Sequence, residues 1–202
     1  MYALDNNMLR TFSISDPLNV VSGQLTYLSW NSETIFPADG YLYIGTTSGM
    51  MIYNTSDPSN PQWEGSISHA RACDPVVVQG NYAYVTVRSG GPCGGDVNEL
   101  DIVDISSKSN PWIVATVDMH NPHGVGVDGN TLFVCDAEKG LKVYNAADPN
   151  TIDQNLIKCF GNIQAVDIIP MNGVAMVIGE EGIYQYDYAD PANLIKLSEI
   201  KF

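Results

Sequence analysis

The chain has 202 residues, of which 45% are hydrophobic and 16% charged, enough for one well-buried globular domain and unlike the composition of a disordered protein. Nine Lys and Arg against 23 Asp and Glu give a formal net charge of −14, which argues against binding to nucleic acid or to anionic lipid headgroups. No apolar run is long enough to cross a bilayer, and residues 1–10 lack the basic segment and apolar core of a signal peptide. These features fit either a cytosolic protein or one whose targeting segment lies outside this sequence.

One unit recurs five times along the chain, at intervals of about 40 to 50 residues, a period typical of solenoids and propellers. The turn segments that mark the copies align at Asp16, Asp57, Ser107, Asp148 and Asp190. Inside each unit apolar residues alternate with polar ones and are rich in aromatic and β-branched types, which predicts strands and no helix. In the second unit, for example, we expect strands over residues 33–38, 41–46, 50–55 and 62–68.

Turn residues set the remaining boundaries. Tight hairpins are expected at the dipeptides Asp39-Gly40, Gly80-Asn81, Gly129-Asn130 and Asn172-Gly173. Units of four strands, A to D from the inside outward, predict an all-β protein with the β-propeller fold. The expected blades are residues 1–28 (partial), 29–68, 69–119, 120–160 and 161–202.

The first unit begins within its strand B and has no strand A. A missing inner strand would leave its neighbour's ladder open to water, so we expect the chain to be the C-terminal part of a longer propeller polypeptide. The alternative is a five-bladed ring with an incomplete first blade.

The segment LDIVDIS at residues 100–106, repeated more loosely as GLKVYNA and GMMIYNT, resembles the LVIVD repeat of bacterial surface β-propellers. Longer stretches, such as NPHGVGVDGNTLFVCDAEKGLKVYNAADP, are similar to the C-terminal repeats of LVIVD-repeat lipoproteins of Bacteroidota. This resemblance implies an exported protein at the outer membrane or cell surface of a Gram-negative bacterium. It would be attached through a lipid anchor outside this sequence.

Strands alternate in direction, so the B–C loops and the D–A connections should share one face, here called the top face. The glycine-rich loop at residues 89–98 and Cys73 would both lie there in the same blade, which predicts a Cys73–Cys93 disulfide worth about 3 kcal/mol and an oxidising compartment. The alternative is two free thiols. Cys135 and Cys159 have a strand between them and are expected to stay reduced.

Counting back from the A–B hairpins places Glu33, Asp74, His123 and Gln164 at equivalent positions at the top of the A strands. The adjoining connections add Trp30, His69, Arg71 and His120, and these eight residues are the candidate ligand-binding rim. Arg71 would clamp a carboxylate or a sugar hydroxyl, Trp30 would offer a flat apolar surface, and Asp74 with His123 would orient the ligand.

The polar rim is also compatible with a purely structural role or with a metal site. Polar residues belong in exposed connections in any case, where they cap backbone groups. A metal site would use His69, Asp74, His120 and His123, but these residues lie on different blades, and no metal or cofactor is predicted.

The leading functional hypothesis is a non-catalytic β-propeller that binds a protein partner in an outer-membrane complex or an extracellular ligand. The alternative is a carbohydrate-binding or glycoside-hydrolysing propeller in which Glu33 and Asp74 are the two carboxylates. A third possibility is a purely architectural disc within a larger assembly. No GxSxG, Walker or HExxH motif occurs in the sequence, and no GxGxxG directly follows a predicted strand. The Asp-Pro segments on the opposite, bottom face are expected to be scaffold.

Overall fold

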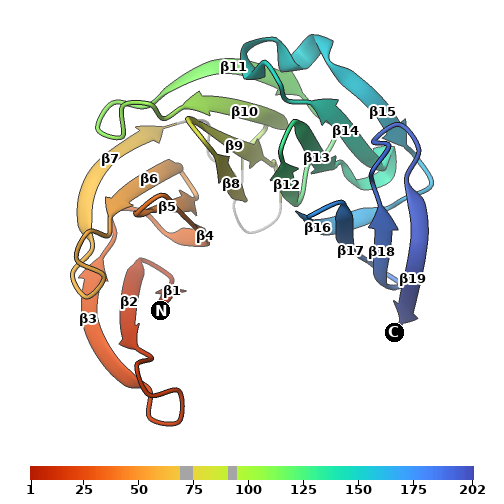
Figure 1. Ribbon diagram of the computed structural model, residues 1–202. Helices are drawn as coiled ribbons and strands as arrows, with labels where there is room; N and C mark the ends of the chain where they lie inside the picture. Colours follow the sequence, from red (N-terminus) through yellow and green to blue (C-terminus); the bar gives the residue numbers. More distant parts are fainter. Residues whose placement is uncertain (69–74, 91–94) are drawn as a thin grey trace.

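The computed structural model describes residues 1–68, 75–90 and 95–202, which form five antiparallel sheets placed one after another around an arc (Figure 1). The first sheet has three strands and each of the other four has four, in sequence order from the inside outward. This arrangement is a β-propeller, so the predicted fold is confirmed, including the first unit without its inner strand.

The first two sheets contain β1 (Tyr2–Asp5), β2 (Met8–Ser13), β3 (Val21–Tyr27), β4 (Ser32–Ala38), β5 (Tyr41–Thr46), β6 (Gly49–Asn54) and β7 (Gln62–Ser68). The third and fourth contain β8 (Val76–Gln79), β9 (Tyr82–Val87), β10 (Glu99–Asp104), β11 (Trp112–Asp118), β12 (Val125–Asp128), β13 (Thr131–Cys135), β14 (Leu141–Asn145) and β15 (Leu156–Phe160). The fifth contains β16 (Ala165–Met171), β17 (Val174–Gly179), β18 (Gly182–Asp187) and β19 (Ile195–Lys201).

The hairpin turns explain why the strand boundaries were predictable. Asp39 and Gly40 have φ of 48° and 79°, and Asn172 and Gly173 have φ of 53° and 86°. Two successive positive φ values define the turn that matches the twist of a two-residue hairpin, and Asn, Asp and Gly reach them at least cost. In the second sheet the four predicted strands agree with β4 to β7 to within one residue at each end.

The prediction of no helix needs a small correction. Two 3₁₀ segments are present, η2 (Ala137–Lys139) and η3 (Pro149–Gln154), and η3 packs against β11 of the preceding sheet. The side chain of Asp148 caps η3 by accepting a hydrogen bond from Asn150 N, and Pro149 follows it with φ already suited to a helical turn. No helix among the described residues is both long and apolar enough to cross a membrane.

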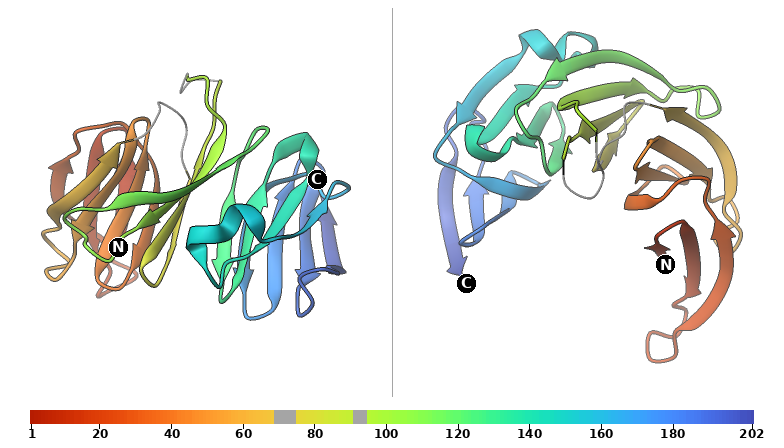
Figure 2. Two further views of the ribbon diagram at one scale, coloured as in Figure 1. Left: turned by 90° about the horizontal axis from the view of Figure 1, so that it is seen from above. Right: turned by 180° about the vertical axis from the view of Figure 1, so that it is seen from behind.

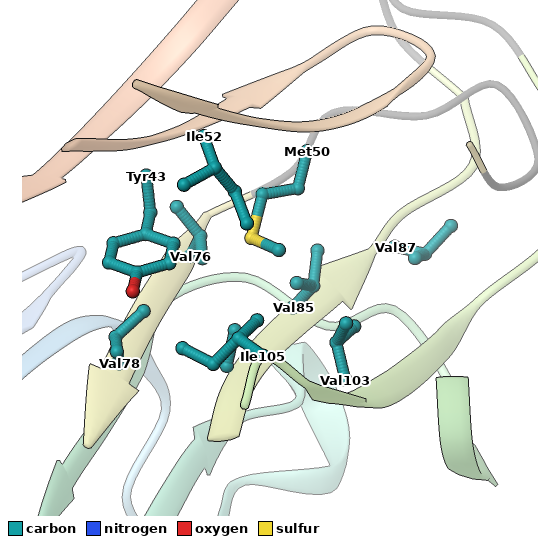
Figure 3. Packing of buried hydrophobic residues seen from close by; sticks show 10 residues of the cluster. Tyr43, Met50, Ile52, Val76, Val78, Val85, Val87, Val103 and Ile105 are labelled. Carbon is teal, nitrogen blue, oxygen red and sulfur yellow. The ribbon is translucent and has the colours of Figure 1, made fainter. Parts of the chain in front are cut away.

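The core lies between the sheets, where an apolar face of each sheet packs against the next sheet. Tyr43, Met50 and Ile52 of the second sheet meet valines of the third, as Figure 3 shows. The same arrangement recurs between the third and fourth sheets and between the fourth and fifth. Tyr43, Tyr84 and Phe133 occupy equivalent places at these three boundaries, with 1%, 2% and 0% of their surface exposed. Central strands are therefore apolar on both faces, as the burial of β5 and β6 shows.

The fifth sheet differs because one of its two faces, the face turned away from the fourth sheet, packs against no other sheet of the described chain. Met176 occupies the position of Phe133 but is 42% exposed, and Ile169, Met171 and Ile200 on the same face are more exposed still. Figure 2 shows that the fifth sheet and the first stand apart at the two ends of the arc. This face of the fifth sheet carries apolar residues like those between two sheets, but here they are not buried.

This contrast predicts different costs for two matched truncations. Phe133→Ala removes a fully buried ring whose centroid lies 5.1 Å from the centroid of the Tyr188 ring. This variant should lower the free energy of unfolding by about 3–5 kcal/mol. Met176→Ala at the equivalent position should cost about 1 kcal/mol, because much of its side chain is already in water. Urea unfolding of both variants measures the difference, and equal losses would show that the two positions are buried alike.

Candidate functional site

The hydrogen bonds confirm that the B–C loops and the D–A connections share the top face. In the fourth sheet, His120 N and Asn121 N of the D–A connection donate to the carboxylate of Asp136 in the B–C loop. Between the first and second sheets, Leu28 N of the D–A connection donates to Asn7 O of the B–C loop at 2.7 Å. The top face is therefore built from segments that the sheet ladders hold together.

The aspartates of the bottom face have a structural role, as expected. Asp57, Asp148 and Asp190 each accept a hydrogen bond at Oδ1 from the backbone N–H two residues later, at 2.9 to 3.1 Å. The hydroxyl of Ser59 and then its N–H lower the pKa of Asp57, and the side-chain amide and N–H of Asn150 do the same for Asp148. These carboxylates hold their own turns and leave little polar capacity for a ligand.

Three of the eight candidate rim residues, His69, Arg71 and Asp74, lie outside the described residues, as do both cysteines of the predicted Cys73–Cys93 disulfide. Trp30 is half-buried and packs against the cluster of Leu9, Leu28 and Leu42 between the first and second sheets. It therefore contributes to the core and does not offer the free flat surface that was expected. Glu33 is exposed, at a bulge in β4 between Ser32 and Thr34.

The position assigned to Gln164 is corrected by the strand registers. Ala38 pairs with Tyr41 across its turn and Met171 pairs with Val174, so the residue equivalent to Glu33 in the fifth sheet is Val166. Val166, like Glu33, lies at a bulge, between Ala165 and Asp167. The polar ring is thus interrupted by an apolar residue, and Gln164 lies in the connection just before β16.

Gln164 nevertheless lies near His123, because both line a small pocket on the top face between the fourth and fifth sheets. This pocket, the rim pocket, has a volume of about 100 Å³ and is also lined by Glu138 and Glu180. Burial lowers the pKa of His123 and the charge of Arg88 adds to the effect, while Glu138 and Asp136 oppose it. The imidazole is therefore neutral at pH 7 and can both donate and accept a hydrogen bond.

His120 lies beside the same loop but makes a different contact. Its Nε2 is 3.2 Å from Oε2 of Glu138, and both side chains are at least half exposed. A contact this exposed contributes little stability, so Glu138 remains available to a ligand. The structure thus brings together His120, His123 and Gln164 of the predicted rim.

A buried carboxylate that the sequence analysis missed supports this loop. The Asp136 side chain is fully buried, 2.8 Å from Lys142 Nζ, and accepts hydrogen bonds from Asn121 N at 2.8 Å and His120 N at 3.0 Å. Burial alone raises the pKa of Asp136, but the bonds from Lys142, Asn121 and His120 outweigh it and hold that pKa below its ordinary value. The ionised side chain therefore fixes the connection that carries His120 and His123.

A larger hollow of about 650 Å³ adjoins the rim pocket, with which it shares Gln164 and Glu180. It lies between β15 of the fourth sheet and β18 and β19 of the fifth, and is called the side hollow below. Phe160, Tyr184 and Tyr186 form its aromatic lining. The same three side chains also pack against the apolar cluster between the fourth and fifth sheets, so each is partly buried.

The remaining cysteines agree with expectation. Cys135 is buried on β13, Cys159 is exposed on β15, and both are free thiols with β14 between them. Burial, with a smaller effect from Asp167, raises the pKa of the Cys135 thiol, which makes it unreactive at neutral pH. In residues 1–68, 75–90 and 95–202, no three His, Cys, Asp or Glu side chains are close enough to hold a metal ion.

Comparison with protein families finds the LVIVD repeat at residues 37–68 and 70–119, which correspond to most of the second sheet and the whole third sheet. These two segments are similar to the LVIVD repeat and together make up less than half of the chain. Comparison with curated proteins finds no match.

Solved structures share the fold across almost the whole chain. The periplasmic gluconolactonase PpgL of Pseudomonas aeruginosa superposes with a TM-score of 0.74 at 9% identity, over 99% of this chain and 65% of its own. A protein from Lactobacillus plantarum gives 0.73 at 14% identity, over 98% and 67%, and AztD of Citrobacter koseri gives 0.59 at 13%, over 96% and 57%. At these identities the likeness concerns the fold alone, and this chain spans less than two thirds of the gluconolactonase and of AztD.

The buried ion pair yields a pH-dependent prediction. Asp136→Asn places an amide beside Lys142 Nζ and leaves that charge unpaired, so it should cost about 3 kcal/mol of stability at pH 7. Because folding lowers the pKa of Asp136, the advantage of the natural residue is complete above about pH 4 and is lost as the pH falls through the folded-state value. Urea unfolding of the natural protein and of Asp136→Asn, at pH 7 and at pH 3, measures how this stability difference changes with pH.

Glu138→Gln is the matched control, since it removes an exposed carboxylate from the same loop and should change stability by less than about 0.5 kcal/mol. A loss for Asp136→Asn that is as small as this, or that does not shrink at acid pH, would contradict the role assigned to Asp136.

Proposed function

We propose that this chain is a non-catalytic β-propeller module that binds a partner with its top face. The observation that supports this is the contrast between the two faces. On the bottom face, aspartates bond to their own turns, whereas on the top face the side chains of Gln164, Glu180 and Glu181 make no hydrogen bond to any described residue. Polar groups without internal partners, gathered beside two hollows, are what a recognition surface needs.

The partner we propose is a protein of an outer-membrane complex or an extracellular ligand. In this proposal the protein is exported and lies at the outer membrane or surface of a Gram-negative bacterium, related to the LVIVD-repeat lipoproteins of Bacteroidota. The LVIVD repeats at residues 37–68 and 70–119 support this assignment. With a net charge of −14 the module is repelled by anionic headgroups, so it meets the membrane through a lipid anchor outside this sequence.

Catalysis is not part of the proposal. Glu33 lies in the second sheet, whereas the rim pocket lies between the fourth and fifth, and Asp74 lies outside the described residues. The likeness to a gluconolactonase at 9% identity concerns the fold and carries no active-site residue to this chain.

The test is capture of the partner by the native protein and by two charge-reversal variants. Glu180→Lys changes the top face, and Asp153→Lys makes the same charge change at an exposed residue of η3 on the bottom face. After mild-detergent purification from source membranes, the natural protein and Asp153→Lys should retain a stoichiometric partner, and Glu180→Lys should retain at least about tenfold less.

Equal retention by the two variants would show that the partner binds elsewhere. The complete absence of a partner from the natural protein, combined with turnover of a substrate, would replace the proposal with an enzymatic one.

A further inference from the structure

The side hollow lies where the fourth and fifth sheets meet, and the C–D connections of these two sheets differ. The C–D connection of the fourth sheet forms η3, which packs against β11 of the third sheet. The corresponding connection of the fifth sheet, residues 188–194, contains no helix and is held by a simple aspartate turn at Asp190. Every residue of β15 from Leu156 to Cys159 is exposed, and Lys158 Nζ donates to Ala192 O of this connection at 2.8 Å.

Large aromatic side chains line the side hollow. Tyr184 and Tyr186 occupy the places of Met51 and Tyr53 in the second sheet, which are buried, but they are themselves partly exposed. Their ring centroids are 6.5 Å apart with planes inclined at 35°, so they form one broad wall along β18. Phe160 lies at the end of β15 with Lys158 Nζ 4.9 Å from its ring centroid.

Polar groups of several kinds surround this wall. The side-chain amides of Asn162 and Gln164 line the hollow and make no hydrogen bond to other described residues. Lys196 and Glu199 of β19 pair with each other at 2.7 Å and present further donors and acceptors. A ligand that fills the hollow therefore has to stack on a ring and form hydrogen bonds at its edge.

This combination excludes most ligand classes. A purely apolar ligand would strip water from the amides and carboxylates without replacing its hydrogen bonds, which is costly. A phosphorylated or otherwise strongly anionic ligand would meet Glu180, Glu181 and Glu199, which outnumber the lysines of the lining, on a chain whose net charge is already −14. A neutral polyol ring has the apolar face and the hydroxyl edge that the lining requires, and 650 Å³ is ample for two such rings.

We infer that the side hollow is a binding site for a neutral sugar, stacked on Tyr184 and Tyr186 and hydrogen-bonded through Asn162 and Gln164. The side hollow shares Gln164 and Glu180 with the rim pocket, but its aromatic wall lines the side hollow alone. Tyr184→Ala should therefore lower sugar binding and leave partner capture unchanged, which separates a failure of this inference from a failure of the proposed function.

The experiment is saturation-transfer NMR followed by calorimetric titration of the full chain with four neutral disaccharides: maltose, cellobiose, lactose and N,N′-diacetylchitobiose. At least one should bind with a ratio of one per chain, and Tyr184→Ala should weaken it at least about tenfold. Tyr27→Ala removes an exposed tyrosine of the first sheet and should leave binding unchanged.

Two further variants keep the test sharp if Tyr184→Ala folds poorly. Asn162→Ala removes an exposed amide of the lining and should weaken binding with no change in melting temperature. Tyr186→Phe keeps the aromatic wall and should retain most of the affinity. Failure of all four disaccharides to bind, or binding that Tyr184→Ala and Asn162→Ala leave intact, would overturn the inference.

Discussion

The packing of one apolar sheet face on the next is the interaction on which this molecule depends. Each strand ladder satisfies the backbone within its own sheet, but no sheet can bury its side chains alone, so stability comes from the boundaries. At three successive boundaries an aromatic ring, Tyr43, Tyr84 or Phe133, fills the same place. This requirement fixes the residue types on strands B and C of the second to fourth sheets, where these strands are largely buried, and leaves them little freedom to bind a ligand.

That constraint also explains why the sequence predicted the fold so fully. Alternation along a strand and Asp-Gly or Asn-Gly at a hairpin are local signals, and repetition let one unit support the interpretation of the others. The segment η3 was missed because Pro149 to Gln154 reads as another Asp-Pro turn. Its helical form is accompanied by packing against β11, a contact with a different sheet that no local pattern reveals.

The candidate site was less predictable, because its properties come from contacts between segments distant in sequence. His120, His123 and Gln164 were placed on the correct face, yet Trp30 turned inward to the core and Val166 took the position expected for Gln164. Asp136 was missed because its burial depends on Lys142 and on backbone N–H groups fifteen and sixteen residues earlier. The side hollow could not be predicted either, since its lining combines residues of β15, β18, β19 and the connection between the two sheets.

Functional residues are therefore expected where packing places the fewest constraints on the type of residue. On the bottom face, aspartate carboxylates stabilise their own turns, and the central strands are buried between the sheets. The top connections and the side hollow beside the fifth sheet therefore remain for binding. On the top face a single buried ion pair, Asp136 with Lys142, holds the D–A connection to the B–C loop and so fixes the backbone around His120 and His123. A scaffold of this kind can change its partner by exchanging exposed connection residues while every sheet boundary stays the same. The polar side chains left without internal partners beside the rim pocket and the side hollow mark the surface on which such changes act.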